Sequence, residues 1–259
     1  MGDEAHQFNA QQPAPKSSAE VLVAQIDGSM VPTVEYQETE SGKKKRVCSW
    51  KEIRLCCVTD PEKEVTRYGV TQGTPFEAGC MMYQTSQQQG LGADTHIHGV
   101  ADGAPWIAEQ YEVQFGANHT FLLDFYHAAE YLAEVAREDI EIGREAWLES
   151  KKAQLKEGQS DQVIADLARL SLAKGEDSAS AKAHQYFSNR REQLRYNDAI
   201  ESKLLNGSGE VESGHRSVLQ ARLKKPGAWW DTSNAEKIAQ LKVMQSNGEW
   251  IKSWKNQAA

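Results

Sequence analysis

The sequence contains no apolar run that approaches the roughly 20 residues of a membrane-spanning helix. It also begins without a secretory signal, because residues 1–20, MGDEAHQFNAQQPAPKSSAE, have neither a basic start nor an apolar core. These two absences predict a cytoplasmic protein with no membrane partner. The chain has 259 residues, of which 39% are hydrophobic, and this length is enough to bury a full core.

Cysteine is scarce, and the paired spacing of metal-binding cysteines is absent. The four cysteines stand at positions 48, 56, 57 and 80, with no C-x-x-C motif among them. A structural zinc site is built from such closely spaced ligands. Two of the four are adjacent within an apolar stretch that resembles a strand. We therefore expect reduced, buried thiols and no zinc site.

Basic charge is in deficit, since 29 Lys and Arg residues against 37 Asp and Glu residues give a net charge of -8. A protein whose whole surface binds nucleic acid would be basic, so that class is disfavoured. The charge is unevenly distributed, however. Acidic side chains dominate between Asp124 and Glu149, whereas residues 213–230 hold four basic side chains and no acidic one.

The first half of the chain alternates between strand and helix patterns. Strands are expected at 20–36, 47–60, 65–73, 95–102 and 119–124, and helices at 74–90 and 104–116. The order is thus β-β-β-α-β-α-β. The segment QETESGKKKR, residues 37–46, has the glycine and charges of a hairpin tip. Its basic run, Lys43 to Arg46, suits either a solvated turn or a phosphate contact.

From residue 125 the hydrophobic periodicity becomes helical and stays so to about residue 204. We expect an all-α block that is acidic on its exposed faces. The Arg-rich end of the block, at Arg190, Arg191 and Arg195, is the part expected to approach DNA phosphates. The predicted organisation is a linker at 1–19, a first core segment at 20–124, the helical insertion at 125–205, and a last core segment with a C-terminal helix at 206–259.

Three carboxylates are candidates for a shared site. Asp27 and Asp102 each precede a glycine at the expected end of a strand, where open sheets place ligands. Asp-Gly pairs also make ordinary turns, so each pair alone is ambiguous. The turn NGSG, residues 206–209, starts a helix that carries Glu210 and Glu212 in its first turn.

Helical spacing separates the two glutamates. Glu212 shares a face with Leu219 and Leu223, and Glu210 falls roughly 200° away around the helix. A carboxylate on an apolar face points inward, where it needs a cation. Two strand aspartates and this glutamate can hold a pair of Mg²⁺ ions roughly 3.5–4 Å apart for phosphodiester chemistry.

Six motifs in this order carry a family resemblance: DGSMVP, DGAPWI, DFYHAAEYL, YFSNRREQLRY, GSGEVES and RLKKPGAWWDTSNAEKI followed by NGEW. Together they resemble bacterial insertion-sequence DDE transposases of the ISKra and ISLre type, and more remotely they are similar to Mutator-like transposases. The resemblance covers about residues 20 to 255. It implies an α/β fold, namely a ribonuclease H-like mixed sheet with flanking helices, interrupted by an all-α insertion before the third acidic residue.

The resemblance also implies roles for single residues. Asp27, Asp102 and Glu212 would be the catalytic metal ligands for two Mg²⁺ ions, for which Mn²⁺ can substitute. Asp124 and His127 match the D-x-x-H that follows the second aspartate in such families. His127 would then support catalysis near the scissile phosphate, or it is simply a histidine at a helix N-terminus.

The basic segment after Glu212 is the expected DNA surface. Its members are Arg216, Arg222, Lys224, Lys225 and Trp229. Trp229 and its neighbour Trp230 either stack on an unpaired base or pack against the last helix. The partners implied are double-stranded DNA, as transposon ends and target, and a second copy in an active homodimer. The location implied is the cytoplasm, at the nucleoid.

Relatives carry a long segment ahead of the first aspartate, whereas this sequence has 26 residues there. We therefore expect the DNA-end-binding region to be lacking. An alternative is a catalytically idle, transposase-derived DNA-binding or interaction protein. A third reading starts from His96 and His98, because His-x-His on a strand resembles the metal motif of amidohydrolases. It is disfavoured because that family needs a barrel of alternating strands and helices, which the helical second half cannot supply.

Overall fold

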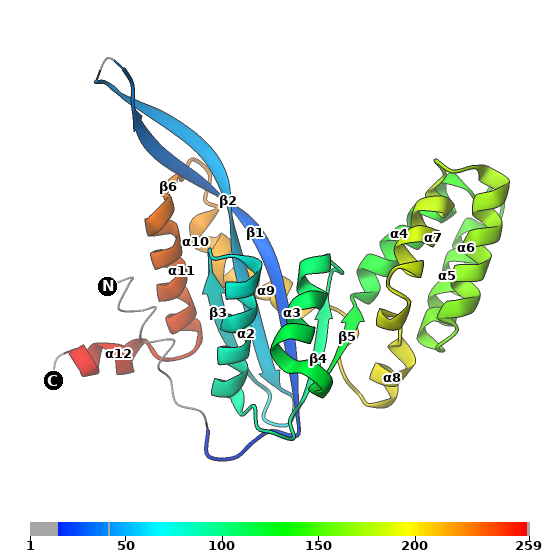
Figure 1. Ribbon diagram of the computed structural model, residues 1–259, viewed down its shortest axis with the longest axis horizontal. Coiled ribbons are helices and arrows are strands. Elements are labelled where there is room, and N and C mark those ends of the chain that lie inside the picture. The colour runs from blue at the N-terminus through cyan, green and yellow to red at the C-terminus, as the bar shows by residue number, and fades with distance from the viewer. Residues whose placement is uncertain (1–14, 41, 258–259) are drawn as a thin grey trace. The chain divides into compact units, whose positions relative to one another are not determined.

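The computed structural model describes residues 15–40 and 42–257 (Figure 1). Residues 1–14 of the expected linker lie outside these ranges. The strands are β1 (Val21–Glu38), β2 (Lys44–Asp60), β3 (Val65–Thr71), β4 (His96–Ala101), β5 (His119–Leu123) and β6 (Trp230–Asp231). No helix of the described part of the chain is long and apolar enough to cross a membrane.

The protein is an α/β structure with a mixed open sheet and flanking helices. The strand order is β3-β2-β1-β4-β5, and β6 pairs with β1 in parallel. The pairings of β1 with β2 and of β2 with β3 are antiparallel. Helices α2 (Pro75–Gln89) and α3 (Pro105–Phe115) separate β3 from β4 and β4 from β5. The element order expected from the periodicity is thereby confirmed.

The chain divides into two compact units. The first consists of Met1–Ile97, Pro105–His119 and Gly209–Ala259, and the second of His98–Ala104 and Thr120–Ser208. The remaining elements of the first unit are η1 (Gly116–Asn118), α9 (Gly209–Gly214), η3 (His215–Gln220), α10 (Ala221–Leu223), α11 (Thr232–Ser246) and α12 (Trp250–Gln257). Strand β4 begins in the first unit and ends in the second.

Helix α2 shows how local sequence signals act. Thr74 caps its N-terminus by accepting a hydrogen bond from the Glu77 backbone N–H, and the Glu77 carboxylate accepts one from the Thr74 backbone N–H. Pro75 occupies the first turn, where its missing N–H costs nothing. Gly90 ends the helix with a φ of 110°, which side-chain-bearing residues rarely adopt. Each of these signals is legible in the sequence.

The core of the first unit lies between the sheet and the helices that follow residue 209. Apolar side chains of β1 and β2 meet those of α9, η3, α10 and α11 there. The fully buried members include Val31, Ile53, Leu55, Leu219 and Leu223. Burial of such residues supplies on the order of 2 kcal/mol for each side chain, and this packing fixes the helices against β1.

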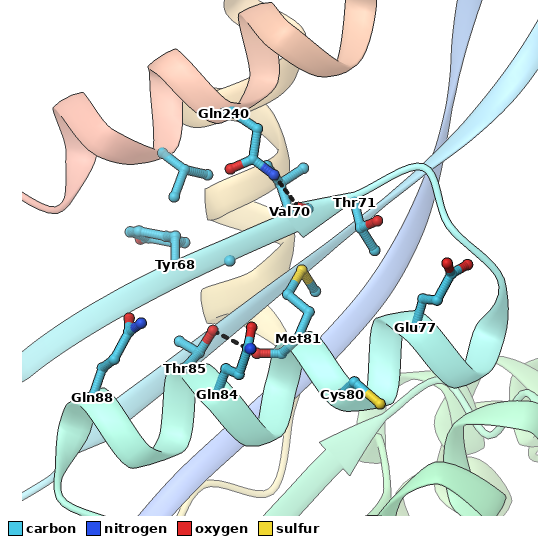
Figure 2. A pocket seen from close by; sticks show the side chains of 12 residues that line it. Tyr68, Val70, Thr71, Glu77, Cys80, Met81, Gln84, Thr85, Gln88 and Gln240 are labelled. Carbon is cyan, nitrogen blue, oxygen red and sulfur yellow. Dashed lines mark hydrogen bonds between the residues drawn. The ribbon is translucent and has the colours of Figure 1, made fainter. Parts of the chain in front are cut away.

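Strand β3 is an edge strand, and side chains of the C-terminal region cover its outer backbone groups. The Asn247 amide bonds both the N–H and the C=O of Tyr68, at 2.9 and 3.0 Å. Gln240 donates to the carbonyl of Val70 at 2.7 Å (Figure 2). Glu236 accepts from the N–H of Gln72. These backbone groups of β3 are therefore not available to pair with a strand of another chain.

The regular elements between residues 125 and 205 are all helical in the described chain, as the periodicity predicts. They are α4 (Phe125–Glu138), α5 (Arg144–Lys156), α6 (Ser160–Lys174), α7 (Ala179–Ser188), η2 (Arg191–Gln193) and α8 (Tyr196–Glu201). Together with β5 they enclose a core that includes Leu132, Leu155, Leu167, Phe187 and Tyr196. The helices pack against one another inside the second unit, so each buries an apolar stripe.

Candidate functional site

Asp27 lies inside β1 and not at its end. The strand continues from Asp27 to Glu38, and its register with β2 runs unbroken through the pairs Asp27 with Leu55 and Gly28 with Arg54. The expectation of a strand end here was therefore wrong, because the Asp-Gly pair reads as a turn only when no partner strand extends it. The Asp27 side chain keeps 36% of its surface exposed.

A continuous helix at residues 209–223 runs along β1. The N–H of Val211 bonds the side chain of Gln25 at 3.0 Å, and His215 Nε2 lies 3.3 Å from Oδ2 of Asp27. Four helical residues rise about 6 Å, and two strand residues advance about 6.6 Å. The helix therefore runs alongside β1, and the stretch from Glu210 to His215 lies next to the part of β1 that carries Asp27.

The structure places Glu210 and Glu212 differently from the expectation. Glu210 is half-buried and accepts a hydrogen bond from Thr59 Oγ1 at 2.7 Å, whereas Glu212 is exposed. The inward direction expected for Glu212 is therefore wrong. The cause lies in η3, which is π-helical and has more residues per turn than an α-helix. A uniform 100° per residue no longer relates Glu212 to Leu219 across that segment.

Glu210 nevertheless does not take the place of Glu212 beside Asp27. Its partner Thr59 pairs with Val23, four residues before Asp27 on β1 and roughly 13 Å away along the strand. Glu212 is one helical turn before His215, which is the residue that contacts Asp27. Side chains three positions apart on a helix are neighbours. The approach of Glu212 to Asp27 stays a prediction.

His215 is a residue that the sequence reasoning did not select. Its side chain is only 4% exposed, and its Nε2 makes the 3.3 Å contact with Oδ2 of Asp27. Burial lowers its pKa to about 4, although the nearby Asp27 backbone opposes the shift and Lys224 adds to it. The ring is therefore neutral at pH 7. A buried histidine with a strongly shifted pKa beside a carboxylate is a frequent mark of a functional site.

Asp102 directly follows β4, as expected, and belongs to the second unit. Its Oδ1 accepts a hydrogen bond from the N–H of Ala104 at 3.0 Å, which closes a tight turn around Gly103. Its backbone carbonyl accepts from the Tyr186 hydroxyl at 3.0 Å. Arg190 donates to the carbonyl of Gly103 through Nε and Nη2, at 3.0 and 2.8 Å. Two side chains of the helical block therefore hold this turn.

Tyr186 and Arg190 are part of a stacked column. Tyr131 and Tyr186 stack with ring centroids 4.0 Å apart, and the Arg190 guanidinium lies 3.9 Å from the centroid of Tyr186. Burial raises the pKa of Tyr186 to about 12, so its hydroxyl stays protonated and can donate to Asp102. Arg190 thus serves the fold of the Asp102 turn, which differs from the phosphate contact expected for it.

The other two arginines of that region are also engaged. Arg191 pairs with Asp161 at 2.6 Å, and Arg195 pairs with Glu192. Both arginines remain exposed at 60% or more of their side-chain surface, so their partners are surface partners. The charge they offer to a phosphate is reduced by these acids. The Arg-rich end of the block is therefore less basic than its sequence indicates.

Asp124 has a structural place at the start of α4. Its buried carboxylate caps the helix by accepting from the N–H groups of Tyr126 and His127, and its other oxygen accepts from Ser208. This bond ties α4 to the residue just before α9. His127 is 39% exposed and lies 3.4 Å from Glu130. It remains accessible, and its catalytic role stays a prediction.

His98 does not have a ring nitrogen to offer a metal. Nδ1 lies 3.2 Å from the Thr120 hydroxyl, and Nε2 lies 2.7 Å from the carbonyl of Leu205. The carbonyl can only accept, so Nε2 carries the proton and Nδ1 accepts from the hydroxyl. His96 has its pKa lowered by burial and by His119. These contacts place the His-x-His pair in the packing around the strand. They do not support the amidohydrolase reading.

The expected DNA surface is open to solvent. Arg216, Arg222, Lys224, Lys225 and Trp229 are all exposed. Arg222 lies over the ring of Trp230 at 4.9 Å, and the Trp230 indole donates to the carbonyl of Leu223. Trp230 thus packs against the core, whereas Trp229 stays at the surface, and its stacking on a base stays a prediction.

A cavity of about 240 Å³ lies elsewhere, between β3, α2 and α11 (Figure 2). Figure 2 shows Gln240 reaching from α11 to Val70 on one side and Gln84 and Gln88 standing on α2 on the other. Glu77 is its one acidic lining residue. None of the three candidate carboxylates lines it, so this cavity is separate from the expected site.

The donor set fits Mg²⁺ in its chemistry, since Asp27, Asp102 and Glu212 offer carboxylate oxygens, the ligands that hard cations prefer. Within the ranges that the structure describes, no group of three His, Cys, Asp or Glu side chains is assembled to hold a metal ion. The convergence of the three carboxylates on one site therefore stays a prediction. Comparison with models of known protein families gives no match, and comparison with curated proteins gives none either.

Proposed function

We propose that the protein is the catalytic core of a DDE transposase, with a ribonuclease H-like sheet, that cleaves and joins DNA strands. The observation that carries this proposal is the contact between Asp27 of β1 and His215 of the helix that begins beside Glu212. Two of the three acidic residues are thereby carried by elements that pack together in one unit. Asp102, in the other unit, stands on a turn held by Tyr186 and Arg190.

In this proposal Asp27, Asp102 and Glu212 hold two Mg²⁺ ions, or Mn²⁺ in their place. When bound, such ions activate a water or a 3'-hydroxyl and stabilise the leaving oxygen of a phosphodiester. His215 adds no charge beside Asp27, because its ring is neutral at pH 7. His127, accessible at the start of α4, is the candidate for contact with the scissile phosphate.

The helix at residues 209–223 and the two lysines that follow it, together called the basic helix, supply the proposed contact with the DNA backbone. Arg216, Lys224 and Lys225 neutralise phosphates irrespective of sequence, so they give affinity and no site choice. The proposed partner is double-stranded DNA, as transposon ends and target. The proposed active form is a homodimer at the nucleoid.

A second candidate function is a transposase-derived protein that binds DNA without cutting it. The exposure of Glu212 favours this candidate, because a glutamate that faces solvent is not enclosed in a metal site. The two candidates make the same prediction for DNA binding. They differ only in metal-dependent strand cleavage.

The test compares Glu212→Gln with Glu210→Gln on an end-labelled duplex in Mg²⁺ and in Mn²⁺. Glutamine at 212 removes a ligand charge and should abolish cleavage while DNA affinity stays unchanged. Glutamine at 210 keeps an oxygen that can accept from Thr59, so cleavage should persist. Persistent cleavage by Glu212→Gln would refute the assignment of this residue, and absence of cleavage in the unmodified protein would favour the idle DNA-binding protein.

A second pair of substitutions separates binding from chemistry. Replacing Lys224 and Lys225 by Ala should weaken binding to all sequences alike. It should also reduce the slope of log K against log salt by about 1.8, the value for two phosphate contacts. Cleavage of the DNA that remains bound should persist. Tight binding to one sequence, unaffected by this change, would contradict the proposed role of the basic helix.

A further inference from the structure

The β1–β2 hairpin extends well beyond the helices that cover its base. In Figure 1 its outer part continues past β6 and α10, the last elements of the first unit that accompany it. Register pairs run to the end of the hairpin, as far as Glu38 with Lys44. We call residues 35–40 and 42–51 the hairpin arm. An arm of this length contributes little to the core, which is formed by the inner halves of the two strands.

One face of the hairpin arm is aromatic and basic. Tyr36 pairs with Arg46, and Pro32 pairs with Trp50, and residues paired across an antiparallel ladder lie on the same face. Trp229 joins this face, because its ring lies 6.3 Å from that of Trp50 at 61° and 5.5 Å from the Arg46 guanidinium. We call Tyr36, Arg46, Trp50 and Trp229 the arm face.

The aromatic rings of the arm face are exposed to an unusual degree. The exposed fractions are 64% for Tyr36, 55% for Trp50 and 37% for Trp229. A tryptophan buries more apolar surface than other residues when a core is available, and clustered exposed rings mark interaction surfaces. The geometry within the cluster also matters. An edge-to-face contact joins Trp50 to Trp229, and the Arg46 guanidinium lies over the Trp229 ring.

The charge of the hairpin arm identifies the partner as an anion. Its turn carries four consecutive basic residues, Lys43 to Arg46, on a chain with a net charge of -8. From residue 35 to residue 51 there are five basic residues against three acidic ones. Basic side chains beside exposed rings match the two parts of a nucleic acid strand, phosphates and base faces. An apolar or acidic protein partner would not need this combination.

We propose that the arm face binds unpaired DNA bases, which stack on Trp50, Trp229 and Tyr36 while Lys43 to Arg46 contact the adjoining phosphates. The bases must be unpaired, because base faces are covered by their neighbours inside a duplex. The inference rests on the proposed function, in which strand cleavage produces DNA ends where bases can unstack. It adds a second DNA surface, distinct from the basic helix, that binds single-stranded DNA and does not bind duplex DNA.

The experiment measures the affinity of the full chain for two probes, a blunt duplex and the same duplex with a single-stranded thymidine tail. Trp50→Ala should weaken binding of the tailed duplex by roughly 5- to 150-fold, the loss of one stacked base, and leave the blunt duplex unchanged. Phe76→Ala is the matched control, because this ring is 57% exposed on α2, outside the arm. It should change neither affinity.

Cys48 gives a second, direct readout. It is exposed on the arm and pairs with Val34, between the Tyr36–Arg46 and Pro32–Trp50 pairs on the same face. Alkylation of Cys48 should slow when the tailed duplex is bound and should not slow with the blunt duplex. Because Trp50 is exposed, Trp50→Ala should keep the unfolding midpoint of the unmodified chain, and this measurement confirms that lost affinity is not lost folding.

The outcomes distinguish the two proposals. Equal affinity of Trp50→Ala and the unmodified chain for the tailed duplex overturns the arm face and leaves the transposase proposal intact. Weakened binding by Trp50→Ala in a protein that never cleaves DNA supports the arm face and overturns the catalytic proposal. Binding to vesicles of phosphatidylglycerol with no binding to either DNA overturns both, and assigns the arm to an anionic lipid surface.

Discussion

His215 Nε2 lies 3.3 Å from Oδ2 of Asp27, and the histidine belongs to a π-helical segment that follows Glu212 in the same helix. The contact joins a central strand to a helix nearly two hundred residues later in the chain. The histidine is buried and neutral, while the aspartate keeps part of its surface in solvent. The helix therefore presents a ring, not a charge, to the carboxylate that the proposed chemistry needs.

The stability of the protein should fall as the pH falls below about 6.5. Burial lowers the pKa of His215 to about 4 in the folded state, and the unfolded chain therefore binds the extra proton first. The stability that the neutral His215 contributes is fully present above the pKa of this histidine in the unfolded chain. It is lost as the pH falls toward its pKa in the folded state. Between about pH 7.5 and about pH 5 the loss from this residue is about 2 kcal/mol.

Urea unfolding in EDTA at the two pH values measures this loss. His215→Gln cannot take up the proton. The change in its free energy of unfolding between the two pH values should therefore be smaller by about 2 kcal/mol. His127→Gln is the control, because that side chain is 39% exposed. An identical pH dependence in His215→Gln and the unmodified protein would show that His215 is not the group responsible.

Gly103→Ala should destabilise the protein more than Gly227→Ala, although the two glycines have nearly the same backbone angle. Their φ values are 78° and 77°. A Cβ at 103 would lie 2.5 Å from Cδ1 of Leu123 and 2.8 Å from the Tyr186 hydroxyl, whereas nothing lies within 4 Å at 227. The strain alone costs about 1–2 kcal/mol, and the crowding adds about 1–3 kcal/mol at 103 only.

Thermal or urea unfolding of the two glycine variants gives the comparison directly. Equal losses would mean that the Asp102 turn relaxes freely around a side chain at 103. Under the proposed function, Gly103→Ala should also impair cleavage, because it moves the backbone of Asp102, and Gly227→Ala should not.

Arg190→Met should cost about 1–3 kcal/mol of folding free energy, because the Gly103 carbonyl loses both of its charged donors. Methionine keeps most of the volume over the Tyr186 ring, so the change removes the charge and the hydrogen bonds of the guanidinium and spares most of its packing. Arg191→Met is the matched control next to it. Its ion pair with Asp161 is exposed on both sides and should contribute at most about 1 kcal/mol. Equal unfolding midpoints for the two variants would count against a special role of Arg190.

Much of the fold could be predicted because its signals are local. Thr74, Pro75 and Gly90 mark the ends of α2, and each signal acts within a few residues of the backbone group that it satisfies. The switch from strand to helical periodicity at residue 125 is similarly visible, because β5 ends at Leu123 and α4 begins at Phe125. Patterns of this kind need no knowledge of the partner segment.

The candidate site was harder to predict because its geometry depends on partners far along the chain. Asp27 was placed at a strand end because the register with Leu55 is invisible in β1 alone. The orientation of Glu212 was wrong because a π-helical segment has no reliable sequence signature. Tyr186 and Arg190 contact the Asp102 turn more than 80 residues away, and His215 is found only when β1 and η3 are seen together.

Thiol chemistry should distinguish Cys48 from the two cysteines of the inner strand. The expectation of buried thiols is confirmed for Cys56 and Cys57 but is wrong for Cys48, which is exposed on the outer part of β2. Burial raises the pKa of Cys56 to about 11, so almost no thiolate forms at neutral pH. Alkylation of the native protein should therefore modify Cys48 first.

Mass spectrometry after timed exposure to iodoacetamide identifies the modified residues. Cys48→Ser should remove the fast phase and leave the unfolding midpoint unchanged, since an exposed thiol makes few contacts. Cys56 and Cys57 should react only once denaturant opens the sheet, because the thiolate is the reactive species and burial suppresses it in both. Rapid modification of Cys56 in the native protein would mean that β2 separates from α2 on the timescale of labelling. It would also contradict the rigid inner sheet from which the arm extends.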